Sequence, residues 1–413
     1  MAAVFALASG CVLVSDSPSH RPRGLRKFLA LDLLDNRFAS LHGLRTLAIL
    51  SVLQFHVTWI FAGENGIALN PWFQALSLKL FFGMDLFFVL SGFLIGTLIL
   101  HAQDTHSPPG TQRVGRFYLR RMFRTFPPYL VVLCVLASVT ALTPNQRANL
   151  PYEFAFLTNW RSLHRPDIVM FWGWSLALEE QFYLVAPLLF WGLYKVRSTR
   201  LQLAVLGALW FGALCIRLRI YFGHGPWADL LLYSALYFRT PTRFDTLVCG
   251  IMLALAERRY GSQLQAWLQH PRHRATLALP AAAALWVLLE PDMFGAEHVQ
   301  LVHVFAWGSI TSLMWFAFLL LLLHGEGWMQ RALAAPVFRY AATLGYGVYL
   351  VHIPLIDHLA VPAARALQAR GVPAFFLWTG GMAAICMLSW GIAYGMHLGI
   401  EKPVLRLRKR WAD

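Results

Sequence analysis

Two ionisable residues stand in the first long apolar stretch of the chain. Arg45 and His56 are eleven positions apart, so on a helix they share one face, with His56 about 16 Å further along the axis. A cation at one mouth of a membrane and an imidazole near its middle would suit a phosphate-bearing thioester donor, because the imidazole can act as a general base where the acyl group arrives. The alternative is an arginine that reaches the lipid headgroups and a histidine hydrogen-bonded between helices.

Three more cations open the third apolar stretch. Arg120, Arg121 and Arg124 are adjacent or three to four positions apart, so two of them can face one ligand. Guanidinium groups bind phosphate oxygens in pairs, which suits the polyanionic part of coenzyme A. The alternative is that these arginines only anchor the helix at the cytoplasmic surface.

Carboxylates occur in two other apolar stretches. Asp85 is expected to pair with a buried cation or histidine, because an unpaired charge in a membrane is costly. Glu179 shares a helix face with Ser175. We expect its carboxylate to touch His56 and to support that side chain as a general base. The alternative is an ion pair with Arg243 that only holds helices together.

The remaining polar candidates are less specific. Ser91 and the glycine after it favour a close helix approach over a ligand contact. Arg243 and Asp245 open the sixth apolar stretch and predict an intrahelical or interhelical ion pair, which could also touch an acceptor. Tyr349 and His352 are three positions apart on one helix face, and the sequence leaves them open between site and packing.

The elements that position these residues are predicted to be membrane helices. The 413-residue chain is 58% hydrophobic and 13% charged, about half the charge of a soluble domain. Apolar stretches of membrane-spanning length recur along it. We therefore predict an all-α, polytopic membrane bundle of about ten transmembrane helices, at 42–62, 79–101, 126–142, 174–194, 201–222, 243–256, 275–290, 300–323, 338–358 and 373–399.

The basic residues predict the orientation of this bundle. The formal net charge is +15, and 24 Lys or Arg fall in the loops on the side of the termini against ten on the other side. The positive-inside rule then places both termini in the cytoplasm, and we expect a multi-pass protein of the bacterial inner (plasma) membrane. Short basic runs between apolar stretches do not form a nucleic-acid surface.

The chain divides into three parts by composition. Residues 1–36 form an expected cytoplasmic N-terminal segment, 37–400 the membrane domain, and 401–413 a basic cytoplasmic tail. The five cysteines are scattered without a CxxC pair, so neither a disulfide nor a metal site is expected.

Five segments together resemble acyltransferase family 3, the integral-membrane O-acyltransferases that modify polysaccharides, lipid-linked sugars, peptidoglycan and some antibiotics. They are Arg45 with His56, Gly83-x-Asp85-Leu-Phe-Phe-Val-Leu-Ser-Gly-Phe93, Arg121-x-x-Arg124, Trp174-Ser-Leu-x-x-Glu179-Glu-Gln-Phe-Tyr183, and Tyr349-Leu-Val-His352. One departure is His42, which stands where the family usually has an acidic residue.

The resemblance implies an acyl-CoA donor, in particular acetyl-CoA, that reaches the site from the cytosol, and no bound cofactor. It implies that His56 is the essential catalytic group, that Arg45, Arg121 and Arg124 lie near the donor, and that Glu179 is required. The expected acceptor is a hydroxyl of a saccharide, a lipid-linked sugar or a glycosylated metabolite. His56 acts either as a general base or through an acyl-histidine intermediate.

Two rival functions have their own signatures. A transporter or flippase for a lipid-linked or small polar substrate also carries mid-membrane ionisable residues, but it favours inverted repeats, and the sequence shows none. A membrane-bound acyltransferase of another fold also uses a histidine in an apolar helix, yet the chain has no strong partner motif for it.

Overall fold

The computed structural model of the chain describes Leu31, Leu33, Leu34 and residues 38–105, 111–161, 165–223, 230–289 and 301–411. Every regular element within these residues is helical. Most of the predicted N-terminal segment 1–36 lies outside the described residues. The all-α membrane fold predicted from the sequence is confirmed.

The described helices follow one another along the chain, several of them extended by short π-helical or 3₁₀ segments. They are α2 (Ala39–Thr58), η2 (Trp59–Glu64), α3 (Pro71–Leu78), η3 (Lys79–Phe82), α4 (Gly83–Thr105), α5 (Thr111–Val139), α6 (Pro144–Phe154), η4 (Thr158–Trp160), η5 (Arg165–Asp167), η6 (Phe171–Gly173), α7 (Trp174–Lys195), α8 (Thr199–Gly223), α9 (Leu230–Tyr237), α10 (Thr240–Leu268), α11 (Pro271–Leu289), α12 (Leu301–Phe305), η8 (Ala306–Ile310), α13 (Thr311–Leu323), α14 (Trp328–Leu333), α15 (Pro336–Leu355), η9 (Ile356–Ala360), α16 (Val361–Gln368), α17 (Ala374–Met396), η10 (His397–Glu401) and α18 (Lys402–Trp411).

Seven described stretches are long and apolar enough to cross a membrane. They are Ala39–Glu64, Pro71–His101, Val114–Val139, Thr199–Gly223, Leu301–Leu323, Pro336–Gln368 and Ala374–Arg408. The other three predicted spans fall in helices α7, α10 and α11, so the count of about ten is approximate. Two helices are longer than predicted: α5 begins at Thr111 and continues through its proline pair, and α10 runs on to Leu268.

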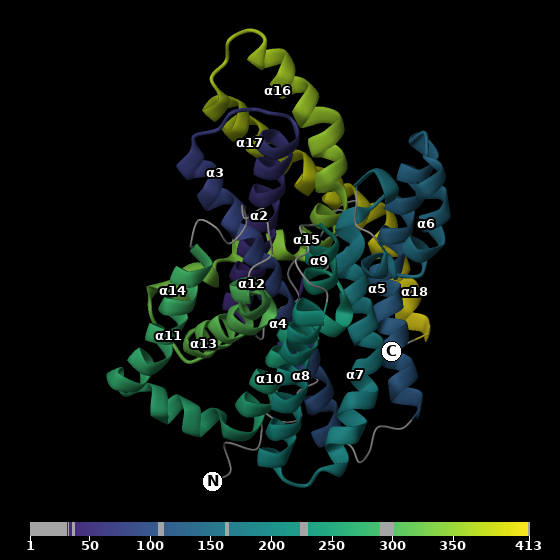
Figure 1. Cartoon of the computed structure of the whole chain (residues 1–413). Helices are drawn as coiled ribbons and strands as arrows, with labels where there is room; N and C mark the ends of the chain where they lie inside the picture. Colours follow the sequence, from purple (N-terminus) through teal and green to yellow (C-terminus); the bar gives the residue numbers. More distant parts are fainter. Residues whose placement is uncertain are drawn as a thin grey trace, which may run out of the picture.

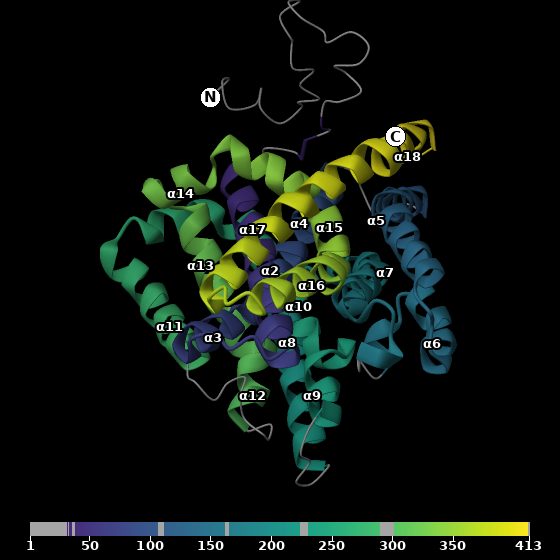
Figure 2. The same ribbon diagram turned by 90° about the horizontal axis from the view of Figure 1, so that it is seen from above.

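The bundle has two distinct ends. Helices α3, α6 and α16 lie at one end, uppermost in Figure 1, and the turn between α7 and α8 lies at the other, with the start of α5 near it. We call these the α6 end and the α7–α8 end. Seen from the α6 end, α5 and α6 lie on one flank and α11 on the opposite flank, with α2 and α10 between them (Figure 2).

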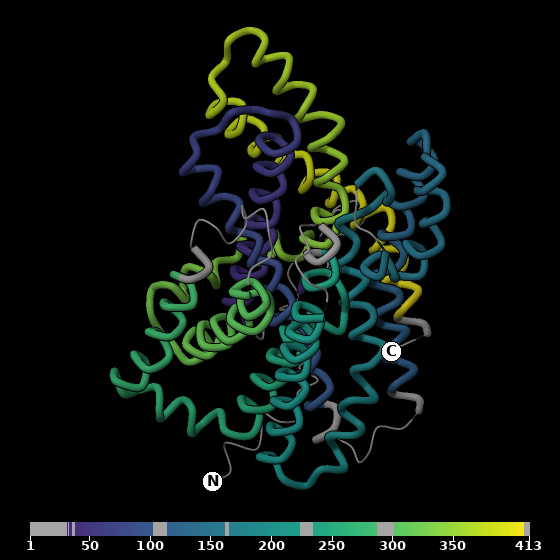
Figure 3. Tube along the Cα trace, in the orientation of Figure 1, coloured from purple at the N-terminus to yellow at the C-terminus, as the bar shows by residue number. Residues whose placement is uncertain are grey.

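Helices far apart in the sequence meet at the centre. Helix α2 packs against both α4 and α15, and α15 packs against α17. Figure 3 shows the purple trace of α2 beside the light-green trace of α15. This pairing places residues from the two ends of the chain against each other.

Helices α4 and α10 approach each other at their backbones. A methyl group on Gly92 would lie 2.0 Å from the Leu247 carbonyl oxygen, and one on Gly250 would lie 2.2 Å from the Val89 carbonyl oxygen. Small residues permit such an approach, and in lipid it supplies the packing that the hydrophobic effect supplies in water.

The break between α12 and α13 is held by a buried arginine. Gly308 adopts a φ of +99°, and Trp307 before it is also non-helical. Arg217 of α8 donates from Nε to the Val304 carbonyl at 2.9 Å and from Nη2 to Ser309 Oγ at 2.6 Å. Backbone groups released by a break inside a membrane need such partners.

We predict that Gly250→Ala destabilises the protein by about 1–3 kcal/mol, because the added methyl forces α4 and α10 apart. The thermal midpoint of the detergent-solubilised protein, followed by size-exclusion chromatography, measures the effect. Gly207→Ala in α8 is the matched control, since a methyl there meets no atom within 4 Å. Equal midpoints for the two variants would contradict the close helix contact.

Candidate active site

Two buried histidines meet in the interior of the bundle. His56 lies near the end of α2 and His352 near the end of α15. The distance from His56 Nδ1 to His352 Nε2 is 3.1 Å, within hydrogen-bond range. The two ring centroids lie 5.0 Å apart.

The partners of His352 determine which nitrogen of His56 is basic. His352 Nδ1 lies 2.6 Å from the Tyr349 carbonyl oxygen, which can only accept, so Nδ1 carries the proton. A neutral His352 then has a lone pair on Nε2, and His56 must donate to it from Nδ1. His56 Nε2 is left with the lone pair that a general base requires.

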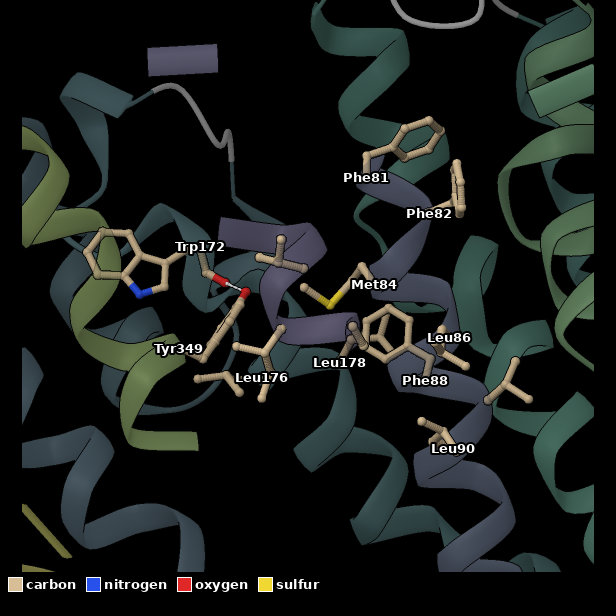
Figure 4. Close-up of a cluster of buried hydrophobic side chains, with 14 of the residues drawn as sticks. Phe81, Phe82, Met84, Leu86, Phe88, Leu90, Trp172, Leu176, Leu178 and Tyr349 are labelled. Atoms are coloured by element: carbon tan, nitrogen blue, oxygen red, sulfur yellow. Dashed lines mark hydrogen bonds between the residues drawn. The ribbon is translucent and has the colours of Figure 1, made fainter. Parts of the chain in front are cut away.

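A hydroxyl network lies beside the histidine pair. The Tyr349 hydroxyl donates to the Trp172 carbonyl oxygen at 2.7 Å, drawn in Figure 4, and lies 2.6 Å from Ser175 Oγ. Because the carbonyl accepts the tyrosine proton, the serine hydroxyl donates to the tyrosine oxygen. Two residues left open by the sequence, Tyr349 and His352, thus belong to one cluster with Ser175.

An apolar cavity runs along α2 between Arg45 and His56. Its volume is about 20 Å³, room for roughly one water molecule. Figure 4 shows three of its lining side chains, Met84, Leu176 and Tyr349. Helix α2 supplies Ala48, Ile49 and Val52 to its wall. The cavity is therefore narrow and apolar.

Glu179 is buried but does not take the position predicted for it. The hydroxyls of Ser91 and Tyr183 both donate to its Oε1. The neighbour that holds His56 is His352, so the predicted carboxylate contact is replaced by an imidazole contact. The reason is geometric: α15 inserts its histidine against α2, while Glu179 faces Ser91 of α4.

The predicted donor-binding arginines gather near Glu179. Electrostatic interactions of Arg45 run to Arg124, Tyr183, Glu179 and Arg121. The guanidinium of Arg121 also stacks over the Tyr183 ring at 5.0 Å. Arg124 remains exposed, and Arg45 and Arg121 are half-buried. In the described part of the chain, none of the three arginines makes an ion pair with a carboxylate within 4 Å.

The other predicted charges form ion pairs away from the histidines. Arg243 Nη2 lies 2.5 Å from Asp85 Oδ1, and Arg217 Nη2 lies 2.9 Å from Asp245 Oδ2. All four side chains are fully buried. The structure therefore gives Asp85 the cation expected for it, and it places Arg243 and Asp245 in the packing between helices.

The sequence did not predict one cluster of charged residues at the α6 end. Arg165 bridges Glu64, at the end of η2, and Asp357, which lies 2.5 Å from its Nη2. Its guanidinium also stacks over Trp59 and Phe171, at 5.6 Å and 4.9 Å from the ring centroids. Glu64 and Asp357 lie 101 and 192 positions from Arg165 along the chain, so no local sequence pattern predicts these contacts.

Comparison with known proteins gives a match over most of the chain. Residues 38–394 match a family described as an acyltransferase domain. The chain is 28% identical over 386 residues to the "Putative peptidoglycan O-acetyltransferase YrhL" of Bacillus subtilis (strain 168), an alignment that covers 88% of this chain and 54% of that protein.

A second relative is more distant. The "Peptidoglycan O-acetyltransferase OatA" of Listeria monocytogenes is 24% identical over 351 residues, which cover 80% of this chain and 51% of that protein. The chain thus spans about half the length of the curated relatives it matches. No solved structure gives a significant match.

A buried carboxylate shapes the loop that delivers Trp172 to the site. Glu153 of α6 accepts from the backbone N–H groups of Val169, at 3.0 Å, and Met170, at 2.7 Å. Burial outweighs these two bonds and raises the pKa of Glu153 from 4.5 to about 7. The folded protein therefore holds this proton up to a higher pH than the unfolded chain does.

The expected consequence is a pH-dependent stability. Between pH 4.5 and about 7 the folded state binds more protons at Glu153 than the unfolded state, so stability falls as the pH rises through this window. Glu153→Gln removes the titration. The wild-type thermal midpoint should therefore fall relative to that of the variant as the pH rises from about 5 to about 8. A constant difference over that range would show that Glu153 does not titrate there.

Proposed function

The chain belongs to the acyltransferase 3 family, and on that premise we propose that it is a membrane O-acyltransferase that moves an acyl group, in particular acetyl, from acyl-CoA to a saccharide hydroxyl. One observation carries the proposal. A histidine with a defined basic nitrogen stands at one end of an apolar cavity, and a cluster of arginines that lack carboxylate partners lies toward the other end.

The arginine cluster supports a polyanionic donor. Arg45, Arg121 and Arg124 repel one another, and among the described residues Glu179, Glu180 and Glu401 are the acids that interact with them. A ligand with several phosphates would relieve this repulsion and form charge-assisted hydrogen bonds. Coenzyme A supplies such phosphates at one end and the thioester at the other.

The cavity supports a path for the thioester arm. Its α2 wall is formed by residues that lie between Arg45 and His56 on one helix. At about 20 Å³ it is too narrow for the arm, so we expect the donor to widen it on binding. Met84 in the wall has an unbranched side chain that can change rotamer easily.

The proposed chemistry uses the unprotonated nitrogen of His56. His56 Nε2 accepts the proton of the acceptor hydroxyl while the oxygen forms a bond to the thioester carbonyl carbon. The carbon–sulfur bond then breaks, and the leaving thiolate takes the proton from the imidazolium. His352 orients the ring throughout, because its Nε2 accepts the His56 Nδ1 proton.

The names of the relatives and the charge distribution support one choice of acceptor and of orientation. Both relatives carry names of peptidoglycan O-acetyltransferases, so a cell-wall glycan is the first acceptor to test. The excess of basic residues on the side of the termini favours a bacterial inner membrane protein with both termini in the cytoplasm. The donor then enters at the α7–α8 end and the acceptor at the α6 end.

We predict that His56→Ala lowers acyl transfer from radiolabelled acetyl-CoA to cell-wall glycan in membranes by at least about 100-fold, because the general base is lost. The variant should still insert in the membrane and keep its thermal midpoint within a few degrees. His270→Ala, an exposed histidine on the α10–α11 turn, is the matched control. Wild-type transfer by His56→Ala would refute the proposed role.

The role of His352 is tested by two substitutions of one residue. His352→Gln keeps an acceptor near His56 Nδ1, whereas His352→Leu removes it. We expect His352→Gln to retain several-fold more transfer activity than His352→Leu at equal protein levels. Equal activity in the two variants would show that the hydrogen bond does not matter.

The role of the arginine cluster is tested by measuring the KM for the acyl donor. Arg121→Ala should raise the KM for acetyl-CoA about tenfold or more, and Arg121→Lys should raise it less, because lysine keeps the charge but cannot bind in a fork. The effect should weaken for a donor analogue without phosphates, such as an acetylated pantetheine. An equal effect of Arg121→Ala on both donors would contradict phosphate binding.

A further inference from the structure

A second cavity opens at the α6 end, outside the groups assigned so far. It lies between the end of α5, helix α6, the loop that contains Arg165 and the segment η9. Its volume is about 140 Å³, several times the ~15 Å³ that one water needs. It can hold one ring-sized group, and its described lining is more polar than that of the cavity between Arg45 and His56.

This cavity borders the histidine pair. The Trp172 ring, which lines it, lies 6.5 Å from the His352 ring centroid. The Phe171 ring, which also lines it, lies 6.4 Å from the His56 ring centroid. Phe171 and Trp172 therefore stand between the cavity and the histidine pair, and they must move aside for an acceptor hydroxyl to reach His56 Nε2.

The ionisable groups around this cavity include more acids than permanent cations. Arg165 lines the cavity and is shared between Asp357, which also lines it, and Glu64. One guanidinium thus faces two carboxylates. Of the described lining residues, Arg165 is the one permanent cation, so the cavity presents no spare positive charge to a phosphate or a carboxylate.

Trp172, one of the lining residues, also has a donor that lacks a partner among the described residues. The indole Nε1 of Trp172 is buried, and no described residue accepts its proton. A buried donor of this kind is stabilised when a ligand oxygen arrives. The rings of Phe171 and Trp172 add flat apolar surface, and Asp357 and Gln146 add polar groups. Small-molecule sites combine apolar walls and a few polar groups in this way.

We propose that this cavity is the acceptor subsite and that it takes a neutral pyranose ring rather than a phosphorylated or carboxylated one. The proposal rests on the proposed acyltransferase function and adds to it the place and the charge class of the acceptor. The aromatic rings pack against the C–H face of the sugar. Trp172 Nε1 donates to a sugar oxygen, and Asp357 accepts from a sugar hydroxyl.

The experiment compares two soluble probes on the full-length protein in membranes or detergent. One is the methyl glycoside of N-acetylglucosamine, which is neutral, and the other is N-acetylglucosamine 1-phosphate, which is anionic. Acetyl transfer to each probe and release of free CoA are measured with acetyl-CoA as donor. The wild type should use the neutral probe with a KM at least about tenfold lower than that for the anionic one.

Two variants then test the wall. Trp172→Phe removes the indole N–H together with the fused ring, and Asp357→Asn replaces the negative charge with a neutral amide of similar shape. Each should raise the KM for the neutral probe about tenfold, with a smaller change in the KM for acetyl-CoA. Asp357→Asn should also reduce the difference in KM between the neutral and the anionic probe. Trp191→Phe, at an exposed position of α7, is the matched control and should change neither KM.

The outcomes separate the two proposals. If the wild type neither releases CoA nor acetylates either probe, the acyltransferase function itself fails. If CoA is released but the anionic probe is used as well as the neutral one, or neither probe is used, the neutral-sugar subsite is overturned. It is overturned equally if Trp172→Phe and Asp357→Asn leave the KM for the neutral probe unchanged.

Discussion

The contact between His56 and His352 depends on two helices from opposite ends of the chain. The residues are 296 positions apart, yet their nitrogens lie at hydrogen-bond distance because α2 and α15 pack against each other. An imidazole in a membrane needs a hydrogen-bond partner that fixes its tautomer. The Tyr349 carbonyl fixes the tautomer of His352, and His352 in turn fixes that of His56. The same two helices are joined again beyond the histidines, where Arg165 bridges Glu64 and Asp357. The contact between the two histidines therefore depends on how α2 and α15 are held at both points.

Charged groups in this bundle fall into two kinds. Arg243 with Asp85, and Arg217 with Asp245, are fully buried and paired. Removing one member of such a pair would leave a stranded charge, so these residues hold helices in register. Arg45, Arg121 and Arg124 are partly accessible and lack such partners among the described residues. The buried ion pairs stabilise the packing of the helices. The accessible arginines have room to contact a ligand.

The sequence predicted the helical fold well, because apolar stretches of membrane length have few other structures open to them. It predicted less well where a helix breaks or lengthens, as at Gly308 or at the start of α5. For the site, spacing on one helix placed Arg45 and His56 on a common face. Spacing could not say which residue from another helix would meet His56, so the expected contact with Glu179 was replaced by His352. Arg165 was missed for the same reason, since its partners are distant in the chain.

The narrow cavity between the arginines and the histidines has a consequence for the cell. A protein that admits one substrate from each face of an energised membrane would short-circuit the proton gradient if a continuous file of water joined its two mouths. The cavity between Arg45 and His56 is apolar, and its volume is about 20 Å³, which is enough for one isolated water molecule. One water without polar neighbours cannot relay protons over the length of the passage. An apolar constriction of this size does not carry a continuous file of water from one end of the bundle to the other.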